Sequence, residues 1–231
     1  MSQESASLGV VIPVLNEAAR LENALAELAR HALHEIIVVD GGSQDKSRSI
    51  VEKYTRTQSN VKLITSEAGR ARQMNAGAAA SSADILCFLH ADTSLPDEAN
   101  QLIQYAVSSN GTWGRFDVRF AEPYRMLRIV AWGMNRRSAL TGICTGDQCI
   151  WVTRELFEKT GGYADIPLME DIELSKRLKK LSRPHRIETQ VTTSARRWLN
   201  NGIVRTIILM WCLRFLYWLG VSPRRLAAMY R

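Results

Sequence analysis

Four short apolar runs, separated by segments of helical spacing, dominate the first hundred residues and constrain the fold most strongly. The runs cover residues 8–12, 36–39, 61–65 and 85–89. The segments between them with helical spacing cover residues 16–30, 43 or 45–54, and 70–80. Continuous β-branched runs joined through helices are typical of a parallel sheet that is buried on both faces. The order therefore predicts an α/β fold.

Beyond residue 110 the pattern is less regular. Residues 113–120 alternate between polar and apolar side chains, which predicts a strand at an exposed edge of the sheet. The other elements expected here are a helix at 124–140, a strand at 149–153 and a helix at 170–181.

The positive charge of the chain is concentrated in its last quarter. Residues 176–231 contain 13 Lys and Arg against one acidic residue, whereas residues 1–175 contain 17 against 22. Such a basic, aromatic-rich tail on an acidic body favours an anionic lipid or ligand, and argues against nucleic acid as a partner. A solvated tail that keeps the protein soluble is the alternative. We expect one domain at 1–195 and a helical appendage at 196–231.

The mostly apolar sequence of residues 203–219 predicts an amphipathic or apolar C-terminal helix, and we expect Pro223 to end this helix. Arg205 and Arg214 interrupt the apolar sequence, so the segment is too short and too charged to span a membrane. Three placements remain open: a helix at the surface of an anionic bilayer, a helix packed on the body, or a helix at the seam of a homodimer.

The four cysteines show no C-x-x-C spacing, and they are Cys87, Cys144, Cys149 and Cys212. Their apolar surroundings predict buried thiols of a reducing compartment, with neither a disulfide framework nor a zinc site. The segment Met1 to Ser7 is polar and lacks the apolar core of a signal peptide. We expect a cytoplasmic protein, with peripheral attachment to the inner face of the membrane as a further hypothesis.

Polar turns follow all four apolar runs, at residues 13–17, 40–43, 67–70 and 90–92. Ligands of an open parallel sheet bind just beyond the carboxyl ends of its strands, so the four turns are expected to converge on one site. Asp40 can accept a hydrogen bond from a base or ribose, and Gly42 allows close approach of the backbone. A turn or helix cap is the alternative role for Asp40, and Asn16 is also available as a cap.

Three further turn residues suit a phosphorylated ligand. Arg70 begins a helix and can meet a phosphate there. His90 and Asp92 supply an imidazole and a carboxylate, which suit a divalent cation such as Mg²⁺ or Mn²⁺ and the phosphates that it holds.

A second carboxylate pair, Glu170 and Asp171, lies at the head of a predicted helix and suits a general base. Acidic residues are also favoured at helix N-termini without any catalytic role. One site for a metal-bound leaving group and one for a base together predict a transferase.

These turns resemble known motifs. The sequences V-I-P-V-L-N-E at 11–17 and I-V-V-D-G-G-S-Q-D at 37–45 resemble the opening of family 2 glycosyltransferases. The resemblance covers roughly residues 8–190 and continues through His90-Ala91-Asp92, at the D-x-D position, and through Gly161-Gly162-Tyr163 and Glu170-Asp171. Residues 146–174 are similar to a bacterial branch, the arsenosugar-biosynthesis-associated glycosyltransferases.

The resemblance implies a GT-A fold, which is a Rossmann-like, mainly parallel sheet flanked by helices. It also implies an inverting, metal-dependent transfer of a sugar from a nucleotide-diphosphate donor to a hydroxyl acceptor. Asp92 would hold Mg²⁺ or Mn²⁺ on the diphosphate, and Asp171, supported by Glu170, would accept the acceptor's proton. The residues implied to line the nucleotide pocket are Pro13, Asn16, Glu17 and Asp40.

The chain departs from the family pattern at two places. His90 replaces the first aspartate of D-x-D and carries no fixed negative charge, although imidazole can ligate Mn²⁺ or hydrogen-bond a ribose. A cap on the strand end is its structural alternative. The sequence S-A-R-R-W at 194–198 resembles the Q-x-x-R-W motif of processive members, with Ser in place of Gln. Without transmembrane helices to build a channel, a single transfer is expected.

The acceptor is expected to meet residues of two polar segments. Arg197 and Trp198 belong to the S-A-R-R-W segment. Asp147 and Gln148 belong to a polar segment, and a purely structural role in a turn explains these two residues equally well.

Two other functions compete. A sugar-phosphate nucleotidyltransferase uses a similar sheet, but it usually carries a glycine-rich basic loop after the first strand. A non-catalytic, membrane-peripheral protein could bind lipid through residues 196–231. Neither G-x-G-x-x-G after the first strand nor G-x-x-x-x-G-K-[ST] is present, which argues against dinucleotide and P-loop sites.

Overall fold

The computed structural model describes residues 6–230, and the first five residues of the polar N-terminal segment lie outside this range. The strands are β1 (Leu8–Val14), β2 (Glu35–Asp40), β3 (Val61–Thr65), β4 (Ile85–Phe88), β5 (Thr93–Ser94), β6 (Trp113–Phe120), β7 (Ile150–Thr153) and β8 (His185–Thr193). The helices are α1 (Ala18–Leu28), α2 (Ser47–Thr57), α3 (Arg70–Ala80), α4 (Ala99–Ser108), α5 (Arg125–Thr141), the 3₁₀ turn η1 (Gly146–Gln148), α6 (Arg154–Thr160), α7 (Glu170–Leu181), α8 (Arg196–Asn201), α9 (Ile203–Trp218) and α10 (Pro223–Tyr230).

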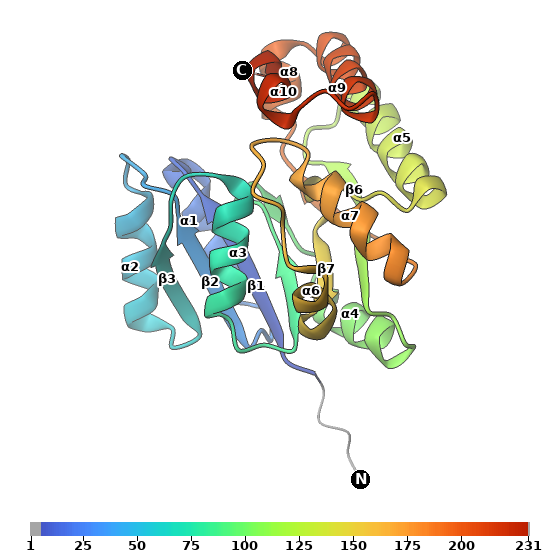
Figure 1. Cartoon of the computed structure of the whole chain (residues 1–231). Helices are drawn as coiled ribbons and strands as arrows, with labels where there is room; N and C mark the ends of the chain where they lie inside the picture. Colours follow the sequence, from blue (N-terminus) through green and yellow to red (C-terminus); the bar gives the residue numbers. More distant parts are fainter. Residues whose placement is uncertain (1–5, 231) are drawn as a thin grey trace.

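One eight-stranded sheet in the order β3-β2-β1-β4-β7-β6-β8-β5 forms the centre of the molecule (Figure 1). Strands β1 to β4 pair in parallel, whereas β7 pairs antiparallel with both β4 and β6. Strand β8 pairs in parallel with β6, and the short β5 joins it antiparallel. The predicted α/β fold, with a mainly parallel sheet flanked by helices, is confirmed.

The two faces of the sheet bury separate apolar cores. Alternate residues of β1 divide between them: Val10 and Ile12 face the core that includes α1, whereas Val11 faces the core that includes α3. In Figure 1, α3 lies in front of the sheet and α1 behind it. The strands are therefore apolar on both sides, which is why the first half of the sequence shows continuous apolar runs.

Strand β6 is an interior strand, so its prediction as an exposed edge was wrong. It lies between β7 and β8, and its first six residues are buried. Two of the charged side chains that suggested a solvent face are buried: Arg115 pairs with Asp117, which also accepts a 2.7 Å hydrogen bond from Arg186 of β8. Ion pairs compensate these buried charges. A strand with such pairs therefore shows the same alternation of polar and apolar residues in its sequence as a strand with one face in solvent.

The C-terminal helices pack on the body, which is one of the three placements left open by the sequence. Leu213 of α9 and Leu226 of α10 are fully buried against Met169 and Ile172, at the start of α7. Helix α9 ends at Trp218, and Pro223 begins α10 instead of ending the preceding helix. Among residues 6–230, no helix is both long enough and apolar enough to cross a membrane.

Three of the cysteines are buried as predicted, namely Cys87, Cys144 and Cys149. Cys212 is exposed, so the prediction was wrong there. It lies on α9, whose apolar side chains surround the whole helix while only one face meets the body.

Candidate functional site

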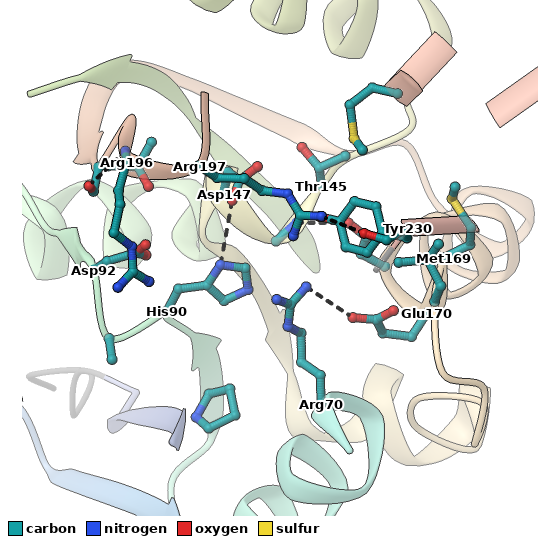
Figure 2. Close-up of a pocket in the computed structure, with 18 of the residues that line it drawn as sticks. Arg70, His90, Asp92, Thr145, Asp147, Met169, Glu170, Arg196, Arg197 and Tyr230 are labelled. Carbon is teal, nitrogen blue, oxygen red and sulfur yellow. Dashed lines mark hydrogen bonds and ion pairs between the residues drawn. The ribbon is translucent and has the colours of Figure 1, made fainter. Parts of the chain in front are cut away.

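A pocket of about 680 Å³ lies at the carboxyl ends of β1 and β4 (Figure 2). Its walls come from the end of β1, the start of α3, the turn after β4, η1, the start of α7 and the helices α8 to α10. Strand ends and helix N-termini thus converge as expected for an open α/β sheet.

Most of the predicted site residues line this pocket, and they are Pro13, Glu17, Arg70, His90, Asp92, Asp147, Glu170, Asp171, Arg197 and Trp198. The predicted residues outside its lining are Asn16, Asp40, Gly42 and Gln148.

Three of the outlying residues build the turns beside the pocket. The side-chain oxygen of Asn16 accepts a hydrogen bond from the backbone N–H of Gln44 at 2.8 Å, and Asp40 accepts one from Ser43 at 3.1 Å. Asn16 and Gly42 both have positive φ angles, of 57° and 93°. This geometry fits the turn role that the sequence left open for Asp40.

Asn16 does not cap α1, contrary to the sequence-based expectation. Glu17 precedes the helix, and the side chains at the start of α2 satisfy its first N–H groups. The N–H of Glu17 donates to Ser47 and that of Ala18 donates to Asp45, at 2.9 and 3.0 Å. One tight junction between two helix starts therefore shapes this side of the pocket.

Gln148 is fully buried behind the pocket lining. Its side-chain oxygen accepts a 2.7 Å hydrogen bond from Ser138 of α5 and a weaker one from the backbone of Thr145. Gln148 thereby anchors η1 to α5 and fixes the turn that carries Asp147.

Arg70 and Glu170 join two helix starts across the pocket. An Arg70 nitrogen lies 3.5 Å from a carboxylate oxygen of Glu170, which is buried (Figure 2). Burial of a carboxylate is tolerated because a cation faces it. The pair leaves the Arg70 guanidinium directed into the pocket, where an anionic ligand can meet its other nitrogens.

Asp171 is the best candidate for a base. Its two carboxylate oxygens accept hydrogen bonds from the N–H groups of Gly146 and Ile172, at 3.0 and 2.7 Å. Burial, followed by the charge of Glu170, raises its pKa to about 6, although the two N–H groups and Arg70 oppose the rise. Asp171 is therefore ionised at neutral pH and is a stronger base than an ordinary carboxylate.

His90 faces Asp147, with 3.5 Å between its Nδ1 and a carboxylate oxygen. Burial raises the pKa of Asp147, but the contact with His90 and the charges of Arg70 and Arg137 outweigh it and leave that pKa lowered. The other ring nitrogen of His90 is buried and has no hydrogen-bond partner among residues 6–230. A Cβ at Gly146 would lie 2.5 Å from that nitrogen, so a larger residue there would displace the His90 ring.

A divalent cation bound in this pocket would need phosphate oxygens of a ligand to complete its coordination. Within the described range, no group of three or more His, Cys, Asp or Glu is placed to hold a metal ion. Asp92 nevertheless lines the pocket beside His90, and Mg²⁺ is typically bound through one or two carboxylates plus phosphate oxygens. Asp92 supplies such a carboxylate.

Arg197 is held by the last described residue of the chain. Its guanidinium carbon lies 3.5 Å from the centre of the Tyr230 ring, and it donates a 3.0 Å hydrogen bond to the Tyr230 carbonyl (Figure 2). Sequence reasoning missed Tyr230 because no local pattern connects it with a site residue. It also missed Gly146, whose N–H reaches Asp171 only through the tertiary fold.

The fold is shared with solved glycosyltransferase structures. The mannosyltransferase PcManGT of Pyrobaculum calidifontis, solved with GDP-Man and Mn²⁺, matches with a TM-score of 0.68 at 19% identity over 83% of this chain and 58% of that chain. TarS 1–349 of S. aureus, solved with UDP-GlcNAc, matches with a TM-score of 0.68 at 16% identity over 81% of this chain and 58% of that one. The chain thus has the GT-A fold.

The sequence identifies the family. The family model of Glycosyl transferase family 2 matches residues 9–159, and the chain belongs to this family. It is 23% identical over 205 residues to the probable glycosyltransferase YdaM of Bacillus subtilis, which covers 78% of this chain and 48% of the relative. It is 31% identical over 93 residues to the glycosyltransferase AglE of Haloferax volcanii, covering 38% of this chain and 31% of AglE.

The predicted family is therefore confirmed, while the arsenosugar-associated branch stays a prediction. The chain spans less than half the length of either relative.

Proposed function

We propose that this protein is an inverting glycosyltransferase that uses Mg²⁺ or Mn²⁺ and moves one sugar from a nucleotide-diphosphate donor to a hydroxyl acceptor. The observation that carries the proposal is a single pocket that joins His90 and Asp92 after β4 with Asp171 at the start of α7. A leaving-group site and a base in one pocket suit a direct displacement. The GDP-Man and UDP-GlcNAc complexes of the structural relatives are consistent with this donor class.

The donor side of the pocket carries the residues suited to a diphosphate. Asp92, with His90 beside it, would hold the cation, which supplies charge neutralisation of the departing diphosphate. Arg70 adds a guanidinium group that matches phosphate oxygens. We assign the nucleoside to the adjoining turns, whose predicted contacts are Pro13, Asn16, Glu17, Asp40 and Gly42.

The acceptor side centres on Asp171. As the acceptor oxygen forms its bond to the anomeric carbon, the bond from that carbon to the diphosphate oxygen breaks, and the hydroxyl proton moves to the Asp171 carboxylate. Glu170 keeps that carboxylate basic, since its charge contributes to the raised pKa of Asp171. Acceptor contacts are assigned to Asp147, Arg197 and Trp198, with Gln148 supporting the turn from behind.

Replacing Asp171 tests the proposal. Asp171→Asn keeps the size of the side chain and removes the base, so turnover with donor and acceptor should fall about 10²–10⁴-fold. Donor affinity and the midpoint of thermal unfolding should stay close to those of the wild type.

Asp165→Asn is the matched control, because Asp165 is exposed and pairs with Arg72 outside the pocket lining. Turnover of Asp171→Asn within twofold of the control would rule out Asp171 as the base.

Nucleotide binding separates the competing functions. Isothermal titration with UDP, GDP, UTP and GTP, each with and without Mn²⁺, should give tighter binding of a diphosphate that depends on the cation. Preference for a triphosphate would favour a nucleotidyltransferase. A nucleotide-sugar library, screened by product mass, would identify the sugar. No product from any donor, together with no nucleotide binding, would favour a non-catalytic protein.

A further inference from the structure

Helix α9 presents a second apolar face that the body of the molecule does not cover. Its members recur every three or four residues along the helix, with exposed fractions between 58% and 75%. We call this face the outer stripe, and it consists of Val204, Ile208, Trp211, Phe215 and Trp218. Aromatic rings stack within it, since the centres of Phe215 and Trp218 lie 6.1 Å apart.

The outer stripe is separate from the face that holds α9 in the fold. Leu213 is fully buried, and Leu209 and Leu216 pack with it against the start of α7. A surface helix normally has one apolar face and one polar face. Helix α9 has two apolar faces, of which only the inner one is used within the chain.

Helix α5 also exposes apolar side chains. It contacts α9 and lies directly beside it in Figure 1. Its exposed apolar side chains are Met126, Ile129, Trp132 and Leu140. Two neighbouring helices, distant in the sequence, therefore both expose large apolar side chains, which is unusual for a monomeric surface.

Arginine is the only charged residue on these helices. Neither α5 nor residues 189–230, which include α8, α9 and α10, contain an acidic residue. The exposed arginines on these helices include Arg125, Arg128 and Arg136 on α5, Arg205 on α9, and Arg224 and Arg225 on α10. Arg136 lies over the Trp132 ring, 6.0 Å from its centre.

We infer that the outer stripe and the exposed face of α5 bind the surface of a membrane that contains anionic lipid. Tryptophan favours the depth of the lipid headgroups, and arginine there gains from negative phosphates. Helix α9 would lie parallel to the bilayer, with its inner face still packed on the body. A second copy of this chain fits less well, because two-fold symmetry would place the same arginines opposite one another without any carboxylate between them.

Docking in this way would bring the pocket close to the lipid. The inner face of α9 contributes Thr206, Met210 and Leu213 to the pocket lining, so about one helix diameter of ~10 Å separates the pocket from the outer stripe. A hydroxyl acceptor held at the membrane surface would be within reach. This consequence rests on the proposed function, whereas membrane binding itself does not.

Vesicle binding tests the inference without measuring activity. The full chain should co-sediment with vesicles of phosphatidylcholine and phosphatidylglycerol in equal parts, and much less with phosphatidylcholine alone. Replacing both Trp211 and Trp218 with Ser should lower the partition coefficient by roughly tenfold or more, since each indole loses its buried apolar contact. Raising the salt concentration to ~1 M should weaken binding, because screening then acts within ~3 Å.

The control variant is Tyr105→Ser, which removes an exposed aromatic side chain from α4, at the opposite end of the molecule from α9 in Figure 1. It should bind vesicles as the wild type does. Unchanged partition of the Trp211→Ser/Trp218→Ser variant, or equal binding to both vesicle types, would overturn the inference. A concentration-dependent dimer in sedimentation equilibrium that the same two substitutions abolish would also overturn it, in favour of a second copy.

Discussion

Asp171 occupies a balanced electrostatic environment. Burial and the neighbouring Glu170 disfavour its charged form, whereas two N–H groups and Arg70 stabilise it, and the pKa of about 6 is the result. A lower pKa would make the carboxylate a weaker base, and a much higher one would leave it protonated at neutral pH. The value suits proton transfer near neutral pH.

The acid limb of the rate profile should follow Asp171. Since the base must be ionised, kcat/KM should be constant above about pH 6 and fall tenfold per unit below it. Glu170→Gln removes one cause of the raised pKa, so the limb should move to lower pH. The pH dependence of kcat/KM in both proteins provides the test, and a limb that moves upward in Glu170→Gln would contradict the assignment.

His90 shows how a departure from a family motif is accommodated. We predict from the family resemblance that its imidazole stands where the D-x-D motif has its first aspartate, and a carboxylate oxygen of Asp147 in η1 lies 3.5 Å from its Nδ1. Gly146 provides the space for the ring, and its N–H also holds Asp171. The turn at 146–147 therefore connects His90 after β4 with Asp171 at the start of α7, two residues that are far apart in the sequence.

At the scale of elements, close packing of α3 on the sheet places Arg70 at the pocket. Gly77 of α3 lies against Val11 and Val39, so a Cβ at this position would lie 2.3 Å from a methyl group of Val11. Gln73, one turn before it, is buried and donates 2.8 Å hydrogen bonds to the carbonyl oxygens of Val14 and Val39 at the strand ends. Small residues and one buried amide thus fix the height of the helix above the strands.

Gly77→Ala should destabilise the protein by about 1–3 kcal/mol, the usual cost of overpacking, although alanine's higher helix propensity offsets part of it. The loss should be smaller in a Val11→Ala background, because that substitution removes the colliding methyl group. The free energy of unfolding in urea measures both effects. Gly133→Ala on α5 is the control, since a Cβ there meets no atom within 4 Å; a loss of stability equal to that of Gly77→Ala would refute the steric explanation.

At the scale of the whole molecule, residues from near both ends of the described chain line the same pocket. Pro13 lines it from the end of β1, and Arg197 and Tyr230 line it from the C-terminal helices. The position of the C-terminal helices depends on the small apolar cluster around Leu213 and Leu226. Residues from the range 196–230 therefore line the candidate site.

Leu226→Ala should loosen α10 from the body. Truncation of a buried leucine typically costs about 2–5 kcal/mol of stability. Because Leu226 packs only in the small cluster that holds the C-terminal helices, hydrogen exchange should accelerate in residues 196–230 more than in the sheet. Acceptor KM should rise, because Tyr230 no longer orders Arg197. Met229→Ala, at an exposed neighbouring position, should change neither quantity. Equal acceleration throughout the chain would show that the C-terminal helices and the body unfold together.

Parts of the fold and site that depend on local pattern were predictable. The strands β1 to β4 and the helices α1 to α3 follow from apolar periodicity, because β1, β2 and β4 are buried on both faces and each helix on one. The convergence of Arg70, His90 and Asp92 follows from the rule that strand ends of a parallel sheet meet at one edge.

Features that depend on contacts between distant residues were not predictable. The interior position of β6 rests on the burial of Arg115 and Asp117, and β8 escaped prediction because polar residues alternate along it. Ion pairs and hydrogen bonds inside the fold make such sequences resemble exposed ones.

The sequence by itself determined the family, the layered α/β architecture and the residue types of the pocket, because these depend on local periodicity and short motifs. Only the tertiary structure decided that Gly146 reaches Asp171, that Asp147 faces His90 and that Tyr230 holds Arg197. It also decided which face of α9 is buried. A helix that is apolar on all sides has no polar face in its sequence that would indicate which side meets solvent.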